Sequence, residues 1–182
     1  MSVKKVGDRL FVFQFGDKME KKRVFVRQPW SFNKSLLVLA NFEEHTKLEE
    51  VLLQWCPFRV QIHRLPLGLM TEKIGIILGE TIGEVEEVDV EEGQMVWGRY
   101  LRVRVVINIK KPLKKGSKIT IPGGDTVIAV IKYEKLPDFC YMCGCLDHQE
   151  NDCDKVVSLL NEGGKIRREY GPWMNTTSSE LL

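Results

Sequence analysis

Residues 140–153 read CYMCGCLDHQENDC and carry the clearest structural signal in the chain. Three cysteines and one histidine follow the spacing C-x2-C-x4-H-x4-C. A segment this short cannot bury a core of its own, so its folding requires another source of free energy. Three thiolates and one imidazole complete a tetrahedral zinc site with no open coordination position, as in structural zinc sites. The sequence therefore predicts one structural Zn²⁺, held by Cys140, Cys143, His148 and Cys153.

This spacing is typical of the zinc knuckles of nucleic-acid-binding proteins. Zinc would contribute about 10–16 kcal/mol to such a module, enough to fold it. Gly144 follows the second thiol and allows the chain to turn back with its amides toward sulfur. A redox CxxC should open a helix after a strand, which this continuation does not favour. Cys145 is interpreted as a non-ligand thiol, although it could compete with Cys143 for zinc.

The composition is that of a globular protein whose net charge is too small to indicate nucleic-acid binding by the chain as a whole. The chain has 182 residues, of which 43% are hydrophobic and 29% charged, and its formal net charge is +2. Any positively charged surface that could bind nucleic acid must therefore be confined to part of the chain. Four of the five cysteines lie within the knuckle, which favours metal binding in a reducing compartment. We see no signal peptide and no membrane-length apolar run, so we expect an intracellular protein, nuclear or cytoplasmic, without a membrane partner.

Hydrophobic patterns predict an α+β fold. The clearest strand is 100–109, where Leu101, Val103, Val105 and Ile107 alternate with polar residues. Further strands are expected at 10–15, 36–40, 58–63, 84–90, 118–121 and 126–133. Helices are expected at 18–28 and after Thr71, whereas 43–55 reads equally as a helix or an irregular linker. Glycines 75, 79 and 83 either form a smooth stripe facing a sheet or mark the end of that second helix.

These elements divide the chain into four regions. Residues 1–42 are interpreted as a partial RRM-like β-α-β region and 43–136 as a second α+β region. The zinc knuckle spans 137–156, and 157–182 is expected to be a flexible tail. The predicted architecture is an RRM-like or ferredoxin-like antiparallel sheet with helices on one face, followed by the CCHC knuckle.

The whole chain resembles a plant family in which a domain of unknown function precedes a CX2CX4HX4C knuckle, found free-standing and in the first reading frame of LINE-type retrotransposons. The matching segments are FQF at 13–15, QPWSF at 28–32, LLVL at 36–39, VQIHRLP at 60–66, GETIG at 79–83, RYLRVRV at 99–105, KYEKLPDFC at 132–140 and YGPW at 170–173. The resemblance implies an RRM-like region and binding of zinc and nucleic acid.

Three departures from that family pattern bear on function. Only nine residues precede the strand at 10–15, so the first sheet is expected to lack a strand, and an open edge of this kind invites a partner or self-association. Asp147 stands where the family has glycine before the zinc histidine. Cys145 stands where the family favours a basic residue.

The knuckle itself is a poor phosphate ligand. Residues 140–153 contain no Lys or Arg but include Asp147, Glu150 and Asp152, and three thiolates leave the zinc site at net −1. Contact with single-stranded RNA or DNA must therefore use an apolar surface, with cations supplied by neighbouring segments. The predicted apolar contacts are Tyr141, Met142 and Leu146. The predicted cations are Lys110, Lys111, Lys114, Lys115, Lys118, Lys165, Arg167 and Arg168.

Other interpretations of these residues remain open. The basic clusters could be solvated surface, and Tyr141 and Leu146 could simply cover the zinc site. Arg99, Arg102 and Arg104 could add an exposed basic sheet face. The alternative function is a protein-interaction or assembly module with a purely structural zinc. Catalysis is not expected, because all four ligand positions are filled and no phosphate loop or nucleophile elbow is present.

Overall fold

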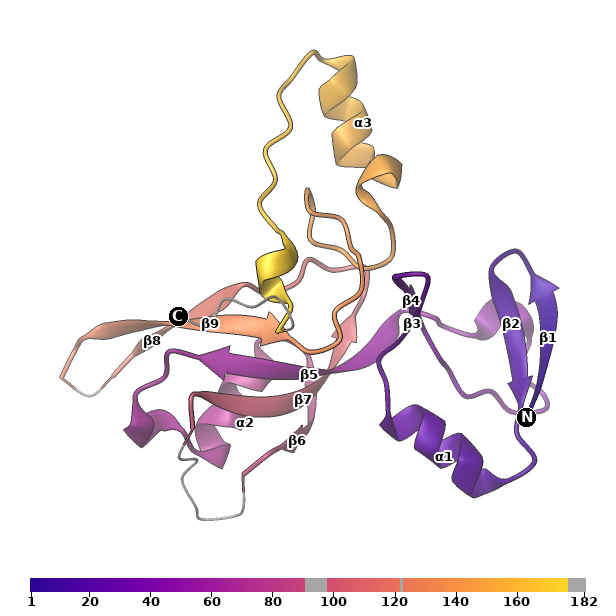
Figure 1. The fold of residues 1–182 in the computed structure, drawn as a ribbon, viewed down its shortest axis with the longest axis horizontal. Coiled ribbons are helices and arrows are strands. Elements are labelled where there is room, and N and C mark those ends of the chain that lie inside the picture. The colour runs from indigo at the N-terminus through magenta and orange to yellow at the C-terminus, as the bar shows by residue number, and fades with distance from the viewer. Residues whose placement is uncertain (91–97, 122, 177–182) are drawn as a thin grey trace.

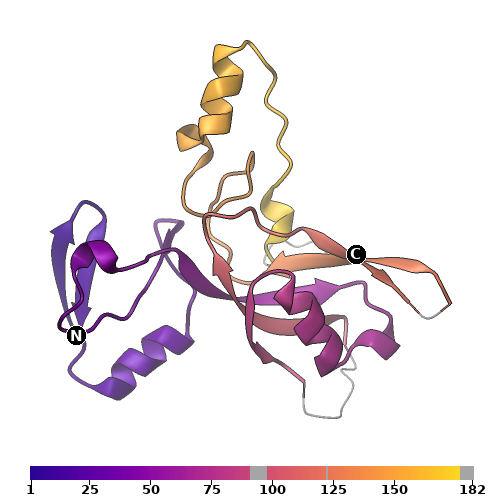
Figure 2. The ribbon, with the colours of Figure 1, turned by 180° about the vertical axis from the view of Figure 1, so that it is seen from behind.

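The computed structural model describes residues 1–90, 98–121 and 123–176, which form three parts (Figures 1 and 2). An N-terminal unit, residues 1–54, lies beside a five-stranded sheet that carries one helix, and the knuckle with α3 projects from that sheet. The elements are β1 Ser2–Gly7, β2 Leu10–Gln14, α1 Lys18–Val26, β3 Trp30–Phe32, β4 Ser35–Leu37, β5 Trp55–His63, α2 Glu72–Glu80, β6 Glu84–Val88, β7 Tyr100–Asn108, β8 Gly116–Thr120, β9 Thr126–Tyr133 and α3 Asp154–Asn161.

The N-terminal unit does not form the predicted β-α-β arrangement. β1 pairs with β2 and β3 with β4, in two separate two-stranded sheets on either side of α1 in the sequence. Strand β1 is not predicted from the sequence because Lys4 and Lys5 interrupt its apolar pattern. The predicted helix at 18–28 is confirmed as α1, which begins after Asp17; the Asp17 carboxylate accepts from the Met19 amide at 3.0 Å.

The last part of the N-terminal unit is a linker to the sheet. Within residues 43–54 it forms a single 3₁₀ turn, Leu48–Glu50, rather than an α-helix. The linker leads directly into β5, which begins three residues earlier than predicted and includes Pro57. Proline is tolerated there because β9 pairs with β5 only from Val60 onward, leaving Pro57 with one strand neighbour, β7.

The main sheet has the strand order β6-β7-β5-β9-β8, with every neighbouring pair antiparallel. The predicted alternation in 100–109 is confirmed, because Leu101, Val103 and Val105 are fully buried. Their face is covered by α2, which lies behind the sheet in Figure 1 and in front of it in Figure 2. The other face carries the polar side chains of β5, β6 and β7. The protein is therefore an α+β fold in which one helix, α2, packs on the main sheet.

Two glycines allow α2 to approach the sheet closely. A Cβ atom on Gly75 would lie 2.6 Å from Val88 Cγ1, and one on Gly79 would lie 2.6 Å from Val85 Cγ2. The glycine stripe therefore faces the sheet, as one of the two sequence interpretations predicted. The helix begins after Thr71, whose hydroxyl accepts from the Ile74 amide, which confirms the predicted N-cap.

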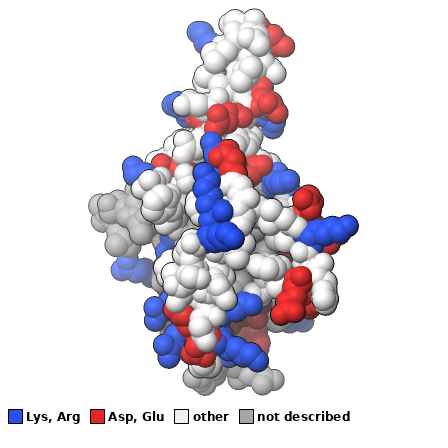
Figure 3. Space-filling view, turned by 90° about the vertical axis from the view of Figure 1, so that its right-hand side faces the viewer, with Lys and Arg blue, Asp and Glu red and all other residues white. Residues whose placement is uncertain are grey.

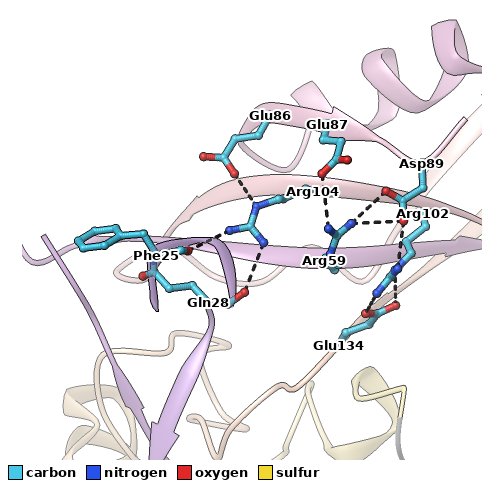
Figure 4. Close-up of polar contacts among 9 residues, drawn as sticks. All are labelled: Phe25, Gln28, Arg59, Glu86, Glu87, Asp89, Arg102, Arg104 and Glu134. Carbon is cyan, nitrogen blue, oxygen red and sulfur yellow. Dashed lines mark hydrogen bonds and ion pairs between the residues drawn. The ribbon is translucent and has the colours of Figure 1, made fainter. Parts of the chain in front are cut away.

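The polar face of the sheet carries an ion-pair network (Figure 4). Three arginines face four carboxylates; the pairs are Arg59 with Glu87 and Asp89, Arg102 with Asp89 and Glu134, and Arg104 with Glu86. The interpretation of Arg102 and Arg104 as part of an exposed basic face is wrong, because each already contacts carboxylates from a neighbouring segment.

Arg104 also connects the N-terminal unit to the sheet. Its side chain is buried, and its terminal nitrogens donate at 3.4 Å to the carbonyls of Phe25 and Gln28, at the C-terminal end of α1 (Figure 4). Its Nε donates to Glu86 at 2.7 Å. A guanidinium at a helix C-terminus is favourable because the last carbonyls lack partners within the helix. Arg104 thereby holds α1 against β6 and β7.

Replacing Arg104 with methionine is expected to destabilise the protein by about 2 kcal/mol, because Glu86 and two backbone carbonyls lose their donor. The measurement is urea unfolding followed by circular dichroism. Arg23→Met, an exposed arginine without an ion pair among the described residues, is the matched control and should change stability by less than about 0.5 kcal/mol. Equal effects of the two substitutions would contradict the role assigned to Arg104.

Candidate metal centre

The four predicted ligands come together in space. One ligand atom from each of Cys140, Cys143, His148 and Cys153 lies within 4.8 Å of the others. The three cysteines are buried and His148 is partly buried. Cys145 lies outside this group, and its thiol donates to the Lys110 carbonyl at 3.4 Å. The donor set is that of a structural Zn²⁺ site, and the residues fit one ion.

The chain turns tightly around the first two thiols. The Gly144 amide donates to the Cys140 carbonyl at 2.8 Å, and the Cys143 amide lies 3.4 Å from Cys140 Sγ. Gly144 has φ +80°, and a Cβ atom there would lie 2.5 Å from the Tyr170 ring. Glycine is therefore required both by the backbone conformation and by the packing of Tyr170. The prediction that this turn aims an amide at sulfur is confirmed.

His148 is oriented by its neighbour Asp147. Its Nε2 lies 3.2 Å from Cys143 Sγ, whereas Nδ1 lies 2.7 Å from Asp147 Oδ1. Metal-binding histidines commonly donate the other ring N–H to a carboxylate, which fixes the tautomer and raises ligand basicity. Nε2 is therefore the nitrogen that faces the metal position. The sequence marks Asp147 only as a departure from the family pattern, and its contact with His148 is not predictable from that.

The thiols differ in acidity. Burial raises the pKa of Cys140 to about 12 and also raises the pKa of Cys143. Burial opposes ionisation of Cys153 as well, but hydrogen bonds led by that from His148 outweigh it and lower the pKa of Cys153 to about 7. Burial likewise disfavours His148 protonation, yet contacts with Cys153 and Asp147 raise its pKa above the ordinary value. Zinc must therefore displace protons from Cys140 and Cys143.

Zinc affinity is expected to rise steeply with pH. Below neutral pH, protons on Cys140 and Cys143 compete with the metal, and each displaced proton changes the apparent Kd about tenfold per pH unit. The apparent Kd should therefore fall at least about 100-fold for each unit between mildly acidic and neutral pH, because zinc also displaces protons from Cys153 and His148 in that range. Competition with a chromophoric chelator at constant ionic strength measures this dependence. A change of tenfold or less per unit would show that fewer thiols are protonated in the zinc-free chain.

The knuckle is docked on the sheet by backbone and apolar contacts. The Leu113 amide donates to the Gly144 carbonyl and the Leu146 amide to the Ile109 carbonyl, both at 2.9 Å. Leu146 and Phe139 are buried, at 5% exposure each, within the core that includes β5 and β7. The segment that follows β7 is thereby fixed beside the zinc ligands.

The C-terminal segment also belongs to the fold over its described part. Met174 is 1% exposed in the main core, and the Asn175 side chain donates to the Leu136 carbonyl at 2.8 Å. The Tyr170 amide donates to the Tyr141 carbonyl at 3.1 Å. The prediction of a flexible tail from residue 157 is therefore corrected for residues 170–176, and residues 177–182 lie outside the described residues. The predicted knuckle boundary at 156 also cuts through α3.

The predicted cations differ in whether the fold gives them an ion-pair partner. Lys110, Lys111 and Lys114 lie on the loop that contacts the knuckle at Gly144 and Cys145. Among the described residues these three make no ion pair, and neither do Lys118, Lys165 and Arg167.

Two of the predicted cations are already engaged. Arg168 forms two 2.8 Å hydrogen bonds with Glu150, one to each carboxylate oxygen. Lys115 Nζ lies 3.5 Å from Glu169 and 4.6 Å from the Tyr170 ring centroid. These contacts link the C-terminal segment to the knuckle and to its neighbouring loop.

The three residues predicted to make apolar contacts differ in how exposed they are. Tyr141 is partly exposed and packs edge-on against Phe139, with ring centroids 5.0 Å apart. Met142 is partly exposed and lines a shallow pocket with residues of α3, including Lys155 and Leu159. Leu146 is buried in the core, so it is withdrawn from the predicted nucleic-acid contacts.

A buried Cys3His group on a short turn defines the protein as carrying a structural zinc knuckle. In agreement, residues 107–155 match the family model described as zinc knuckle. The match begins near the end of β7, so it includes the loop and the strands β8 and β9 that precede the ligands. The comparisons with curated proteins and with solved structures found no match. Among the described residues, no helix is long and apolar enough to cross a membrane.

Proposed function

We propose that this chain is a zinc-dependent protein that binds single-stranded RNA or DNA. The observation that carries the proposal is the docking of the Lys110–Lys111–Lys114 loop beside an exposed knuckle surface. Zinc knuckles commonly bind nucleic acids, and a bare knuckle of this composition would repel phosphate. The loop supplies the cations that the knuckle lacks, while Tyr141 and Met142 supply apolar contact. Zinc acts structurally, by fixing the turn that presents these two side chains.

Four finer assignments belong to this proposal. The strand order β9, β5, β7, β6, with α2 between β5 and β6, supports an RRM-like or ferredoxin-like interpretation of the main sheet, with β8 in place of a second helix. The family resemblance supports a retrotransposon-derived origin. Five free cysteines support an intracellular location, and the saturated ligand set supports binding rather than catalysis.

A protein-interaction or assembly module is the second candidate, and the N-terminal unit favours it. None of the residues of α1, all of which the structure describes, is buried. Large apolar side chains in this unit remain exposed, including Phe32 at 73% and Leu52 at 65%. Figure 3 views the side on which the unit lies in Figure 1 and shows basic side chains spread between acidic and uncharged surface. A surface of this kind suits a partner protein.

The two candidates differ in their response to salt. Binding through phosphates weakens steeply as salt rises, because counterions are released on association. Titration of labelled single-stranded RNA into the zinc-loaded protein at two salt concentrations tests the first candidate. Sedimentation equilibrium of the protein alone tests self-association. Salt-insensitive self-association without nucleic-acid binding would favour the assembly module.

A further inference from the structure

Two aromatic rings lie side by side on the face of the sheet opposite α2, at the end of β5. His63 and Tyr100 are directly opposite each other in the β5–β7 pairing. Their ring centroids are 5.0 Å apart at an interplanar angle of 43°. Both residues are partly exposed. They lie beyond the ion-pair network, whose nearest members on the same two strands are Arg59 and Arg102.

The imidazole ring of His63 is held in place by Gln61. The Gln61 side-chain amide donates to Glu134 Oε1 at 2.7 Å, and its oxygen lies 3.1 Å from His63 Nε2. Because the amide nitrogen is used by Glu134, the Gln61 oxygen accepts, and His63 Nε2 carries the proton. The ring is therefore oriented before any ligand arrives, which reduces the entropy lost on binding.

Two cations lie close to His63. Lys132 is opposite Gln61 in the β5–β9 pairing, and Arg64 follows His63 directly. Within the described part of the chain, neither makes an ion pair. Burial, followed by the positive charges of Lys132 and Arg64, lowers the pKa of His63, so its ring is neutral at pH 7. This end of the sheet thus differs from its centre, where each of the three arginines is paired with a carboxylate.

We propose that the His63–Tyr100 pair is a stacking site for a base of single-stranded nucleic acid, with Lys132 and Arg64 contacting the adjacent phosphates. The inference rests on the proposed function and extends it to a second contact region, separate from the knuckle. Neutral aromatic rings offer a surface on which any base can stack, and flanking cations complement a polyanion. Charge complementarity favours nucleic acid over an apolar protein segment as the occupant.

The test compares a short oligouridylate with an all-abasic oligomer of the same length and charge. The zinc-loaded wild-type protein is expected to bind the oligouridylate at least about 5-fold more tightly, the lower end of the range for one stacked base. Tyr100→Leu should reduce this ratio by about fivefold or more, whereas Tyr100→Phe should retain it. Lys132→Gln should weaken binding of both oligomers to the same extent and leave their ratio unchanged. Tyr141→Leu measures the share of the ratio that comes from the knuckle.

The outcomes separate this inference from the proposed function. Failure of the wild-type protein to bind either oligomer would contradict both. Binding with an unchanged ratio in Tyr100→Leu would overturn the stacking site alone. Binding with no base preference in the wild type would overturn the stacking site and also the apolar contact assigned to the knuckle. If Tyr100→Leu does not fold, photocrosslinking of a 5-iodouridine oligomer to the wild-type protein decides. Crosslinks at His63 or Tyr100 are expected, and crosslinks confined to Tyr141 would overturn the inference.

Discussion

Replacing His148 with alanine is expected to release zinc and unfold residues 140–153. The four ligand atoms close one site, and Leu146 is the one residue of 140–153 that is buried in the main core, which is too little apolar burial to hold the turn without metal. Zinc contributes roughly 10–16 kcal/mol to modules of this kind, so losing one of four ligands removes most of the stabilisation. Metal analysis after dialysis against a mild chelator should fall from one zinc per chain to a small fraction. Cys143→Ser should behave in the same way.

Cys145→Ser is the matched control for these substitutions. Cys145 is a buried thiol in the same turn, but it bonds to the Lys110 carbonyl rather than joining the ligand group. Serine keeps a donor at this position, so one zinc per chain should remain. Full zinc content in His148→Ala, or loss of zinc in Cys145→Ser, would overturn the ligand assignment.

Replacing Lys110, Lys111 and Lys114 together with glutamine is expected to weaken single-stranded RNA binding by about 10- to 100-fold at moderate salt. Among the described residues these three side chains make no ion pair, so they are available to phosphate. The slope of log Kd against log salt concentration should decrease by about 2, because each phosphate contact contributes about 0.7 for a single strand. Tyr141→Leu should weaken binding less and leave the slope unchanged. Fluorescence anisotropy over a salt series measures both quantities.

Lys18, Lys22 and Lys73 provide a control with the same change in net charge. They are exposed lysines on α1 and α2, away from the knuckle loop in sequence. Replacing them with glutamine should leave the slope nearly unchanged. If the control lowers the slope as much as the loop variant does, binding follows net charge and the loop has no special role.

Local chemistry accounts for the features that are predictable from the sequence. The ligands are predictable because tetrahedral zinc demands particular residues at fixed spacing. The central strands are predictable because Leu101, Val103 and Val105 alternate with polar residues, and period-2 alternation is characteristic of a β-strand rather than a helix. Thr71 is recognisable as an N-cap because its hydroxyl has a defined local partner.

The features that are not predictable from the sequence depend on contacts between distant segments. From the sequence, Leu146 is expected to be an exposed apolar residue. It is buried because the knuckle docks on the sheet at Ile109. From the sequence, Arg104 is expected to be a surface cation, because its contacts with α1 and Glu86 depend on the folded arrangement of distant segments. Met174 stands directly before a polar Asn/Thr/Ser stretch, and its position gives no sign of burial in the main core. The nearest of these deciding partners in the sequence, Glu86 for Arg104, is 18 residues away.

The most direct test of zinc-dependent nucleic-acid binding is the Kd for a single-stranded RNA measured across a salt series, with zinc-loaded wild-type protein and with His148→Ala. A slope of about 2 to 4 is expected for the wild-type protein, because six of the predicted cations make no ion pair within the described part of the chain: Lys110, Lys111, Lys114, Lys118, Lys165 and Arg167. His148→Ala should bind at least about 10-fold more weakly, because the apolar contacts of one stacked base are lost with the turn. A Kd that is insensitive to salt, or equal in the two proteins, would contradict the account.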